Sequence, residues 1–575
     1  MGAIAAACVL NSVTFKLNDP DFWQHLLVGK AIWQLHEIPR THQWSWPTFG
    51  QPEVLPSWGF RALLWPFWAI GHVAGLFVWR WLTTLATFAI AWWTARRIGA
   101  RGLLPFLVIV VCALVSRYRS QVRPETLAGV LLALQVFLLE TRRQGGRDHT
   151  AWIVPIAVVW ANVHISYYLA LILLALYLAP WAHPRGPDRR LAMVGVVSLF
   201  ACLLNPFGWT ALIQPIQYFL VWRHEPIYQA IAELHGIDWA FHARDGLLLL
   251  MILWPLLQVW RAFTRGADAV EATLWALFTW LAVFNQRFTG TWAIFAAIFV
   301  SRDLSSVLPW PPLPQLRWAA APATAALCVV LSLPEWSRRD IQPGIGIDPE
   351  CSPVAACDFI ERHDIRGRFF NHFELGGYLA WRFWPDRTRL PFMDIHQSGT
   401  RADRLVYEAV MSSQPTWVAA AQRYGFDVAI LRRVHARGDN MLNFLDADSS
   451  FALVFVDDVA AIYVRRGGRL SAVVDSCCYD VLPGGMNRLA ELGTTIDRTP
   501  GQRARFRQEL ERGIVESPAC SSLLSLLATL DIQEGKLAAA REHLNRARAV
   551  DPLVPMYFER LALIDRAEGR HGESP

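Results

Sequence analysis

The stretch "VAGLFVWRWLTTLATFAIAWWTA", residues 73–95, decides the class of fold. A transmembrane helix needs about 20 predominantly apolar residues, and this stretch supplies them. Similar runs follow at 101–116, 124–140, 151–163, 165–181, 190–206, 245–260, 270–285, 289–307 and 317–335. Stretches 60–70 and 209–222 are candidates for further short or interfacial helices, and the run after Met1 is too short to span comfortably. The sequence therefore predicts a polytopic α-helical membrane domain over residues 1–335, with about 10–12 transmembrane helices.

The composition also indicates a membrane protein. The 575 residues are 54% hydrophobic and 18% charged, whereas a soluble globular protein is nearer about 25% charged. Tryptophan occurs 28 times and concentrates at membrane interfaces. The net charge of +6 is modest, and no basic run resembles a nucleic-acid-binding arm. We therefore expect membrane lipid around the chain and no nucleic-acid partner.

The loops between the apolar runs fall into two sets. One set is short and rich in arginine, as in "ARRIGARG" (95–102), "TRRQGGRD" (141–148), "HPRGPDRR" (183–190) and "VWRAFTRG" (259–266). The positive-inside rule places this set in the cytoplasm. Counting helices then places the other set outside, together with everything after residue 335. The first external loop covers residues 18–58.

The extracytoplasmic loops hold nearly all the unusual polar side chains of the membrane half. Helix ends are wet in any case, and an Arg or Asp costs much less there than the about 2.5–3.5 kcal/mol of a helix centre. That reading does not explain why acids, histidines and arginines gather on one side, whereas a shared outward-facing cavity does. The residues concerned are Asp19, Asp21, His25, His36, Arg117, Arg119, Arg123, Glu125, Asn162, His164, Asn205, Arg223, His224, Glu225 and Arg287.

An ordered set of motifs resembles bacterial proteins of the GT-C glycosyltransferase superfamily. The resemblance covers most of residues 18–465, and it departs from the family pattern in the short first helix and in "WQH", where a second tryptophan is common. The motifs are "DPDFWQHLLVGKAIWQLHEIPRT" (19–41), "SWGFRALLW" (57–65), "RPETLAGVLLAL" (123–134), "WANVHISYYLALILLALYL" (160–178), "LLNPFG" (203–208) and "FFNHFELGGYLAWRFWP" (369–385).

The resemblance implies a reaction and a location. A polyprenyl-phosphate sugar donor would enter from the outer leaflet, and its sugar would pass to a glycan, lipid or protein acceptor. An acidic residue of the first external loop would act as the base or would orient the acceptor. The protein would lie in a bacterial inner membrane, with its C-terminal part in the periplasm.

The candidate catalytic residues are Asp21 and Asp19. Displacement at an anomeric carbon needs a base for the acceptor hydroxyl and a means of stabilising the departing phosphate. Either aspartate could be the base while the other caps the following helix, and Asp21 stands at an N-cap-like position. Arg123 and Arg287 are candidates to bind the phosphate. Their alternatives are a lipid-headgroup anchor for Arg123 and a structural ion pair for Arg287.

The other candidate substrate-binding residues are His25, Glu125, His164 and Arg223. Pro124 and Glu125 fit the first turn of a helix, where an acidic group is favourable, and His164 has a packed, hydrogen-bonded histidine as its alternative. Arg117 and Arg119 are weaker candidates, because they could simply snorkel. No spacing of His, Cys, Asp or Glu supports a metal site, so we expect no cofactor; the alternative is a divalent metal ion with His224 and Glu225 as ligands. Cys351 and Cys357 could pair in an oxidising compartment.

The chain after residue 335 divides into two regions. Residues 336–470 alternate apolar runs with helical stretches, which predicts a small α/β domain, and Asp394 and His396 stand where a strand would end. Residues 484–575 predict helices, and 521–575 fit two tetratricopeptide-like repeats at a 34-residue step. Two repeats are too few to stand alone, so we expect them to pack on preceding helices and to be a candidate site for a protein partner.

Two other functions fit the sequence. A transporter or flippase of a lipid-linked substrate would show ionisable residues at mid-span and inverted repeats, and neither is clear. A non-catalytic envelope assembly factor would use the helical repeats as a dock and would tolerate the loss of Asp19 and Asp21.

Overall fold

The computed structural model describes residues 1–182, 188–229, 231–310, 317–337, 341–396, 399–433 and 440–569. The chain forms two compact units. Unit 1 comprises Met1–Thr41 and Pro52–Asp348, and unit 2 comprises His42–Gln51 and Pro349–Pro575. Most of the predicted cytoplasmic loop "HPRGPDRR" lies outside the described residues.

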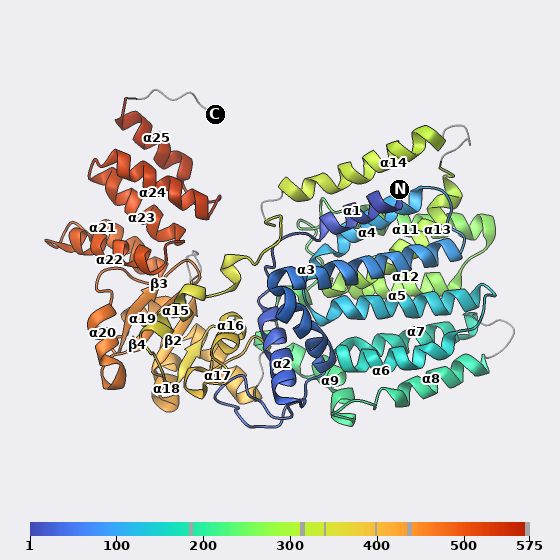
Figure 1. The fold of residues 1–575 in the computed structure, drawn as a ribbon, viewed down its shortest axis with the longest axis horizontal. Coiled ribbons are helices and arrows are strands. Elements are labelled where there is room, and N and C mark those ends of the chain that lie inside the picture. The colour runs from blue at the N-terminus through green and yellow to red at the C-terminus, as the bar shows by residue number, and fades with distance from the viewer. Residues whose placement is uncertain are drawn as a thin grey trace. The chain divides into compact units, whose positions relative to one another are not determined.

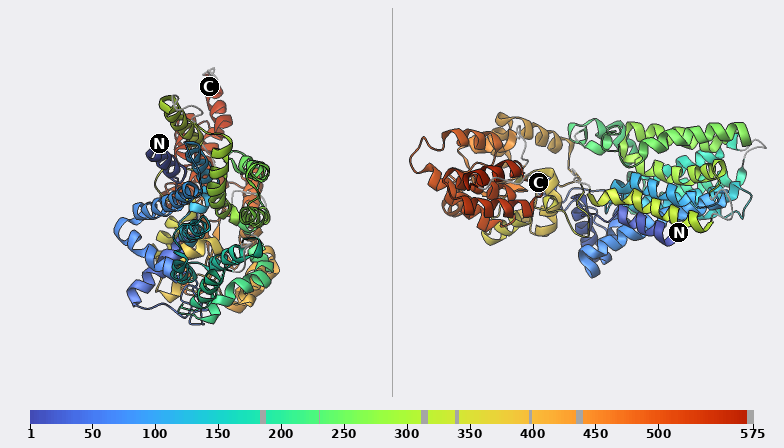
Figure 2. Two further views of the ribbon diagram at one scale, coloured as in Figure 1. Left: turned by 90° about the vertical axis from the view of Figure 1, so that its right-hand side faces the viewer. Right: turned by 90° about the horizontal axis from the view of Figure 1, so that it is seen from above.

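Unit 1 is a bundle of helices that run side by side in each view, with α2 lying across them at one end (Figure 1, Figure 2). The apolar runs of the sequence form these helices. Their bounds are α1 (Gly2–Ser12), α2 (Asp21–Leu35), α3 (Trp58–Arg97), α4 (Leu104–Ser116), α5 (Pro124–Arg143), α6 (Ile153–Val163), α7 (Tyr168–Leu178), α8 (Arg189–Ala201), α9 (Trp209–Leu220), α10 (Pro226–Gln229), α11 (Leu247–Arg265), α12 (Ala269–Phe284), α13 (Thr289–Val307) and α14 (Arg317–Ser332).

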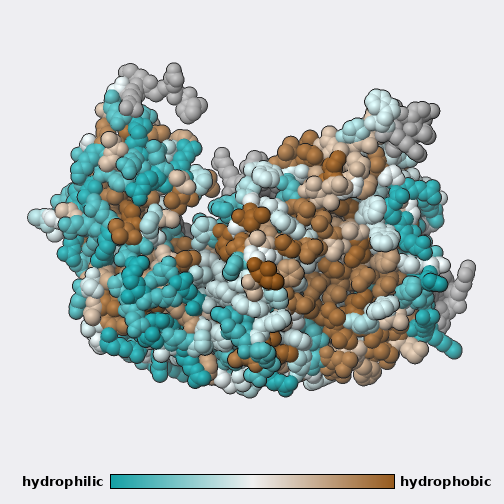
Figure 3. All heavy atoms as spheres, viewed as in Figure 1, coloured by the Kyte–Doolittle hydropathy of each residue, from teal (hydrophilic) through white to brown (hydrophobic). Residues whose placement is uncertain are grey.

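Three helices of unit 1, α3, α5 and α11, are long and apolar enough to cross a membrane. Five shorter apolar segments accompany them, including residues 150–163 and 165–178. Apolar side chains gather on the surface of this bundle, whereas hydrophilic ones dominate the visible surface of unit 2 (Figure 3). Because lipid rather than water favours such an apolar surface, these features indicate an integral membrane protein.

Helix α3 joins two segments that the sequence separates. The predicted short helix at 60–70 continues directly into the predicted span at 73–95, with a sharp kink at His72, where φ is 45°. The Phe67 carbonyl then lies so close to Gly75 that a side chain there would collide with it. Gly29 of α2 meets the Arg61 carbonyl in the same way, so glycine permits α2 and the first part of α3 to pack closely.

The boundary of unit 1 lies at Asp348 rather than at the predicted residue 335. Residues that follow α14 pair with the chain between α1 and α2, through bridges between Phe15 and Pro343 and between Leu17 and Ile347. The backbone N–H of Lys16 donates to the Gln342 carbonyl at 2.8 Å. These long-range pairings add the segment to the membrane bundle, and no local sequence pattern announces them.

Unit 2 contains a mixed four-stranded sheet of order β1-β2-β4-β3. Strand β1 is parallel to β2, whereas β4 is antiparallel to both β2 and β3. The tight β3–β4 turn is held by Asp457, whose carboxylate accepts from the N–H groups of Val459 and Ala460. The strands are β1 (Phe369–Asn371), β2 (Val428–Arg432), β3 (Phe451–Val456) and β4 (Ala460–Arg465), and the helices around them are α15 (Val354–Arg362), α16 (Phe373–Phe383), α17 (Arg401–Ser412), α18 (Gln414–Tyr424), α19 (Asn440–Ala447) and α20 (Ser471–Cys477).

The tip of the first external loop, residues 42–51, belongs to unit 2. Trp46 donates through its indole N–H to the Phe369 carbonyl at 2.8 Å. Nε2 of the buried His42 lies 3.5 Å from a carboxylate oxygen of the buried Asp394. The sequence predicted a strand end at Asp394, but the segment is irregular and the carboxyl is fully buried. Asp394 therefore serves the packing of the loop tip.

Helices α21 to α25 repeat their contacts at a 34-residue step. Arg507 pairs with Asp531 and Glu534, and the residues 34 positions later, 541, 565 and 568, pair in the same way. Three glycines with positive φ also recur at this step: Gly501, Gly535 and Gly569. The contact between α22 and α23 thus recurs 34 residues later between α24 and α25, which is the step of the predicted repeats. The bounds are α21 (Met486–Thr495), α22 (Gln502–Glu516), α23 (Ser521–Gln533), α24 (Leu537–Val550) and α25 (Tyr557–Ala567).

Candidate functional site

Charged side chains from separate loops meet at one end of the unit 1 bundle. They come from the start of α2, from the short helix η1 (Arg117–Ser120) and the start of α5, and from the short helices η6 (Ala232–Leu234) and η7 (Gln286–Phe288). We call this group the charge cluster. Its members are Asp19, Asp21, Arg119, Arg123, Glu125, Glu233 and Arg287.

Arg123 is the centre of the charge cluster. Its guanidinium makes two bonds to the Asp19 carboxylate, one of them at 2.8 Å. It lies 3.1 Å from an Asp21 oxygen and donates to Glu233 at 2.8 Å. Arg123 is the N-cap of α5, with extended backbone, so its side chain leaves the helix mouth toward the three acids.

Glu125 extends the cluster to Arg287. It lies in the first turn of α5, as the sequence indicates, and its carboxylate is paired with the Arg287 guanidinium. Arg119 donates to Glu233 at 2.6 Å and lies 3.6 Å from Glu125. The arginines and acids thus form a continuous chain of contacts, in which Arg287 keeps 33% of its side chain exposed.

The cluster contains four carboxyl groups and three guanidinium groups. Burial raises the pKa of Asp21 to about 7, and the neighbouring Asp19 and Glu233 act in the same direction, against the pull of Arg123. Burial would also raise the pKa of Glu233, but Arg123 and Arg119 hold it well below its usual value. The cluster has one carboxyl group more than it has guanidinium groups, and Asp21 is the acid whose pKa is raised. Its side chain is 25% exposed.

The N-cap of α2 is Pro20, without a side-chain cap bond, so neither aspartate is the N-cap, and Asp19 is the one whose side chain contacts the start of the helix. A carboxylate oxygen of Asp19 accepts from the Asp21 backbone N–H at 3.1 Å, and Asp21 is the first residue of α2. The sequence offered Asp21 as the cap. Because Asp19 makes this bond and also binds Arg123, its carboxylate is committed to structure, and Asp21 is the freer of the two acids.

The other predicted site residues lie in different surroundings. The ring of the buried His25 meets Phe60 edge-on, with centroids 5.3 Å apart. His164 lies close to Glu125 and Arg287, and burial lowers its pKa to about 4; its Nδ1 accepts from the Ser166 N–H. The exposed Arg223 donates to the His224 ring at 3.3 Å. His25 thus packs against an aromatic ring, and Arg223 contacts its neighbour in sequence.

Two members of the cluster were not selected from the sequence. Glu233 stands in a long loop with several other charged residues, and nothing in its local pattern distinguishes it from them. Arg119 was treated with Arg117 as a residue that could snorkel. The two arginines differ: Arg117 is fully buried and donates to the Leu114 carbonyl at 2.9 Å, whereas Arg119 enters the cluster.

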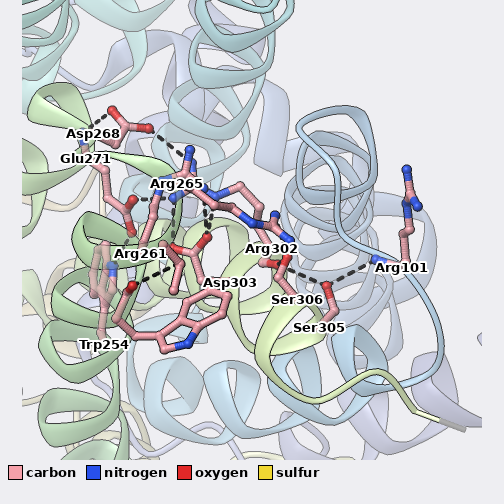
Figure 4. Close-up of polar contacts among 12 residues, drawn as sticks. Arg101, Trp254, Arg261, Arg265, Asp268, Glu271, Arg302, Asp303, Ser305 and Ser306 are labelled. Atoms are coloured by element: carbon pink, nitrogen blue, oxygen red, sulfur yellow. Dashed lines mark hydrogen bonds and ion pairs between the residues drawn. The ribbon is translucent and has the colours of Figure 1, made fainter. Parts of the chain in front are cut away.

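A second charged group, shown in Figure 4, lies near the C-terminal end of α13, which is the end away from Arg287. Asp268 of this group also pairs with Arg143, the last residue of α5. Arg302 bonds Asp303 at 2.7 Å, Asp268 at 3.1 Å and also Glu271. Glu271 further accepts from the Trp254 indole N–H at 2.9 Å. Arg302, Glu271 and Asp303 are nearly completely buried. Because each charge has close partners and little access to solvent, this group ties helix ends together.

Among the described residues, no group of three His, Cys, Asp or Glu side chains is arranged to hold a metal ion. Cys351 and Cys357, which the sequence offered as a pair, are not joined by a disulfide bond. Cys357 is buried in α15, whereas Cys351 precedes that helix and is only partly buried.

Comparison with known proteins identifies the fold. No family model and no curated protein sequence matches this chain. Its fold is similar to that of the oligosaccharyltransferase AglB from Archaeoglobus fulgidus in complex with an inhibitory peptide and a dolichol-phosphate, with a TM-score of 0.52 and 11% identity over 82% of this chain and 74% of that chain. The apo form of the Archaeoglobus fulgidus oligosaccharyltransferase gives 0.51 and 12% over 81% and 74%. The chain therefore has an oligosaccharyltransferase-like fold.

Proposed function

We propose that this chain is a GT-C-type membrane glycosyltransferase of the bacterial inner membrane. It transfers a sugar from a polyprenyl-phosphate-linked donor to an acceptor on the extracytoplasmic face. The observation that carries the proposal is the charge cluster, in which loops far apart in sequence bring Asp21 beside Arg123 at one end of a membrane bundle. The three long helices, the five shorter apolar segments and further helices of unit 1 would together form a domain of about 10–12 spans.

Each group in the cluster suits a step of sugar transfer. Asp21, with its raised pKa, accepts the proton of the acceptor hydroxyl as the oxygen attacks the anomeric carbon. The bond from that carbon to the phosphate oxygen breaks with inversion, and the lipid phosphate leaves with the electron pair. Arg287, which is partly exposed, and Arg123 stabilise the phosphate charge, as guanidinium groups pair well with phosphate.

The oligosaccharyltransferase-like fold supports a lipid-linked donor. The archaeal protein of similar fold was solved with a dolichol-phosphate and an inhibitory peptide, and dolichol-phosphate is itself a polyprenyl-type lipid phosphate. For this chain we propose the same chemical class of donor. The helical repeats at 521–575, which we take as tetratricopeptide-like from their 34-residue step, would bind a protein partner in the periplasm.

The test is donor consumption by the purified protein in lipid nanodiscs. A panel of polyprenyl-phosphate sugars is offered with cell-envelope extract as acceptor, and wild type is compared with Asp21→Asn and Asp19→Asn. We expect Asp21→Asn to lower the rate by about 100-fold or more, because it removes the base. Asp19→Asn should also lower it, through the loss of its bonds to Arg123.

A matched control is Asp238→Asn. Asp238 is exposed, and its carboxylate accepts from the backbone N–H groups of Ala240 and Phe241, so this variant should keep the wild-type rate. Consumption that is indifferent to Asp19→Asn and Asp21→Asn would move the catalytic site elsewhere. Failure of the wild type to consume any donor of the panel would count against the transferase and favour a transporter or an assembly factor.

A further inference from the structure

Arg80 of α3 is fully buried, with 0% of its surface exposed. No carboxylate pairs with it among the residues that the structure describes. Its Nε donates to the Ser120 hydroxyl at 3.1 Å and its Nη1 donates to the Phe15 carbonyl at 2.8 Å. The guanidinium carbon also lies 3.8 Å from the centre of the Phe15 ring. A single cationic side chain thus joins two segments distant in sequence.

These two segments carry four of the seven members of the charge cluster. Phe15 begins the stretch that leads to Asp19 and Asp21, which we call the acidic arm (residues 15–21). Ser120 lies in the stretch from 117 to 123 that carries Arg119 and Arg123, which we call the basic arm. Farther along the two arms, the Gln121 amide donates to the Asn18 side chain at 2.5 Å. Arg80 is therefore the deepest cross-link between the arms.

The neighbours of Arg80 on α3 grip the same region. The Trp79 indole donates to the Thr126 hydroxyl at 3.1 Å, and that hydroxyl donates to the Arg123 carbonyl at 2.8 Å. The Trp81 indole donates to the Thr14 hydroxyl at 3.0 Å. The two neighbours of Arg80 thus contact Thr14, just before the acidic arm, and Thr126, just after the basic arm.

Stability alone does not account for an arginine at this place. Burying a charge without an opposite charge is costly, and Nη2 of Arg80 has no hydrogen-bond partner among the described residues. An apolar side chain of similar length would avoid this cost. What the guanidinium adds is geometry, because its planar fork donates in two directions at once, which a lysine ammonium on a flexible stem does not reproduce.

We propose that Arg80 is a positioning residue that sets the spacing between the acidic and basic arms, and so holds Asp21 at its working distance from Arg123. The inference rests on the proposed function for its kinetic consequence. Its structural content, the coupling between the arms, does not depend on which reaction the cluster performs.

The kinetic test compares Arg80→Met and Arg80→Lys with wild type in the nanodisc assay. Loss of alignment of the reacting groups can cost roughly a hundredfold in rate, so we expect kcat to fall by that order in both variants, while KM for the lipid donor changes much less. Arg80→Lys keeps the charge, so its failure to restore kcat would assign the effect to geometry. Ser120→Ala removes one of the two bonds and should give a smaller loss.

The matched control is Arg302→Met, which removes a buried guanidinium at the opposite end of the bundle. It removes the guanidinium that pairs with the buried Glu271 and Asp303, so it should lower the melting temperature strongly while the folded fraction keeps its kcat. Arg80→Met should show the reverse, with a melting temperature near that of wild type and a low kcat. If both variants lose stability and activity in proportion, Arg80 is merely structural and the proposal is wrong.

A second measurement is independent of catalysis. Melting temperatures of Asp19→Asn, Arg123→Gln and the double variant give the non-additivity of this ion pair, first with Arg80 present and then in the Arg80→Met background. We expect at least half of the non-additivity to vanish without Arg80. Equal non-additivity in both backgrounds would overturn the proposal. If the wild type is inactive but the non-additivity is lost without Arg80, the proposed transferase function is wrong and the positioning role of Arg80 is still supported.

Discussion

Asp19 and Asp21 are separated only by Pro20, yet their carboxyl groups have different surroundings. Asp19 is 7% exposed and is bound by Arg123 and by a backbone N–H. Asp21 makes a single contact to Arg123 at 3.1 Å and is more exposed. A base must change its protonation state near the working pH and must be reached by the acceptor. At the scale of single residues, these differences are the reason why we propose Asp21 rather than Asp19 as the base.

The pH dependence of transfer tests this assignment. Because the pKa of Asp21 is raised to about 7, the carboxyl is protonated below that pH and cannot take the acceptor proton. We expect the single-turnover rate to rise with pH through about 7 and then to level off. Arg223→Gln should keep this profile, since the Arg223 side chain contacts His224 and not the cluster. A rate independent of pH between about 6 and about 8 would contradict Asp21 as the base.

At the scale of elements, the first external loop connects the two units. Its hairpin stem pairs Thr41 with Pro52, and its tip carries Trp44, which is fully buried in unit 2. A substitution near the N-terminus should therefore destabilise a domain that is encoded more than 300 residues later. Sequence order gives no hint of this dependence.

Trp44→Ala measures how much the loop tip stabilises unit 2. Removing a buried tryptophan costs about 3–5 kcal/mol, because the cavity only partly collapses. We expect that loss in the free energy of unfolding of unit 2, followed by denaturant titration in nanodiscs. Trp33→Ala is the control, since Trp33 of α2 is 52% exposed and should cost much less. Equal effects of the two variants would show that the tip does not support unit 2.

The sequence predicted the positions of the helices better than the contacts between segments that are distant in sequence. The length of the apolar runs identifies α3, α5 and α11. The alternation of arginine-rich loops with other loops predicts that Asp21, Arg123 and Arg287 lie at one end of the bundle. These signals are local, or follow from counting helices. The joining of 60–70 to 73–95 depends on the conformation of His72, and the selection of Glu233 depends on long-range packing. Neither leaves a periodic pattern in the sequence.

At the scale of the whole molecule, the side of the membrane decides the chemistry. Helix α5 is 20 residues long, which is about 30 Å and enough to cross the hydrocarbon core. Arg123 stands at its start, whereas the arginine-rich loop at 141–148 follows its end. The charge cluster and that loop therefore face opposite sides. An extracytoplasmic cluster can receive a polyprenyl-phosphate sugar from the outer leaflet, whereas a cytoplasmic one would meet sugar nucleotides.

Cysteine labelling from outside the cell tests the orientation. Cys351 and Cys478 are the partly buried native thiols, and the other seven are buried, so Cys351→Ser with Cys478→Ser gives a quiet background. In it, Arg147→Cys lies in the arginine-rich loop after α5 and Arg423→Cys lies on α18 of unit 2, and both positions are exposed. The positive-inside rule predicts that a membrane-impermeant maleimide labels Arg423→Cys in intact cells and labels Arg147→Cys only after permeabilisation.

The first external loop gives a second reason to expect this labelling pattern, independent of the positive-inside rule. One continuous loop carries Asp19 in unit 1 and residues 42–51 in unit 2. The helix described between them, α2, carries Asp21, His25 and Lys30 and is neither among the helices long and apolar enough to cross a membrane nor among the shorter apolar ones. We therefore expect the labelling to place unit 2 on the same side of the membrane as Asp19. Labelling of Arg423→Cys and Arg147→Cys from the same side would break this reasoning, and labelling of Arg147→Cys alone would place the cluster in the cytoplasm and exclude an outer-leaflet donor.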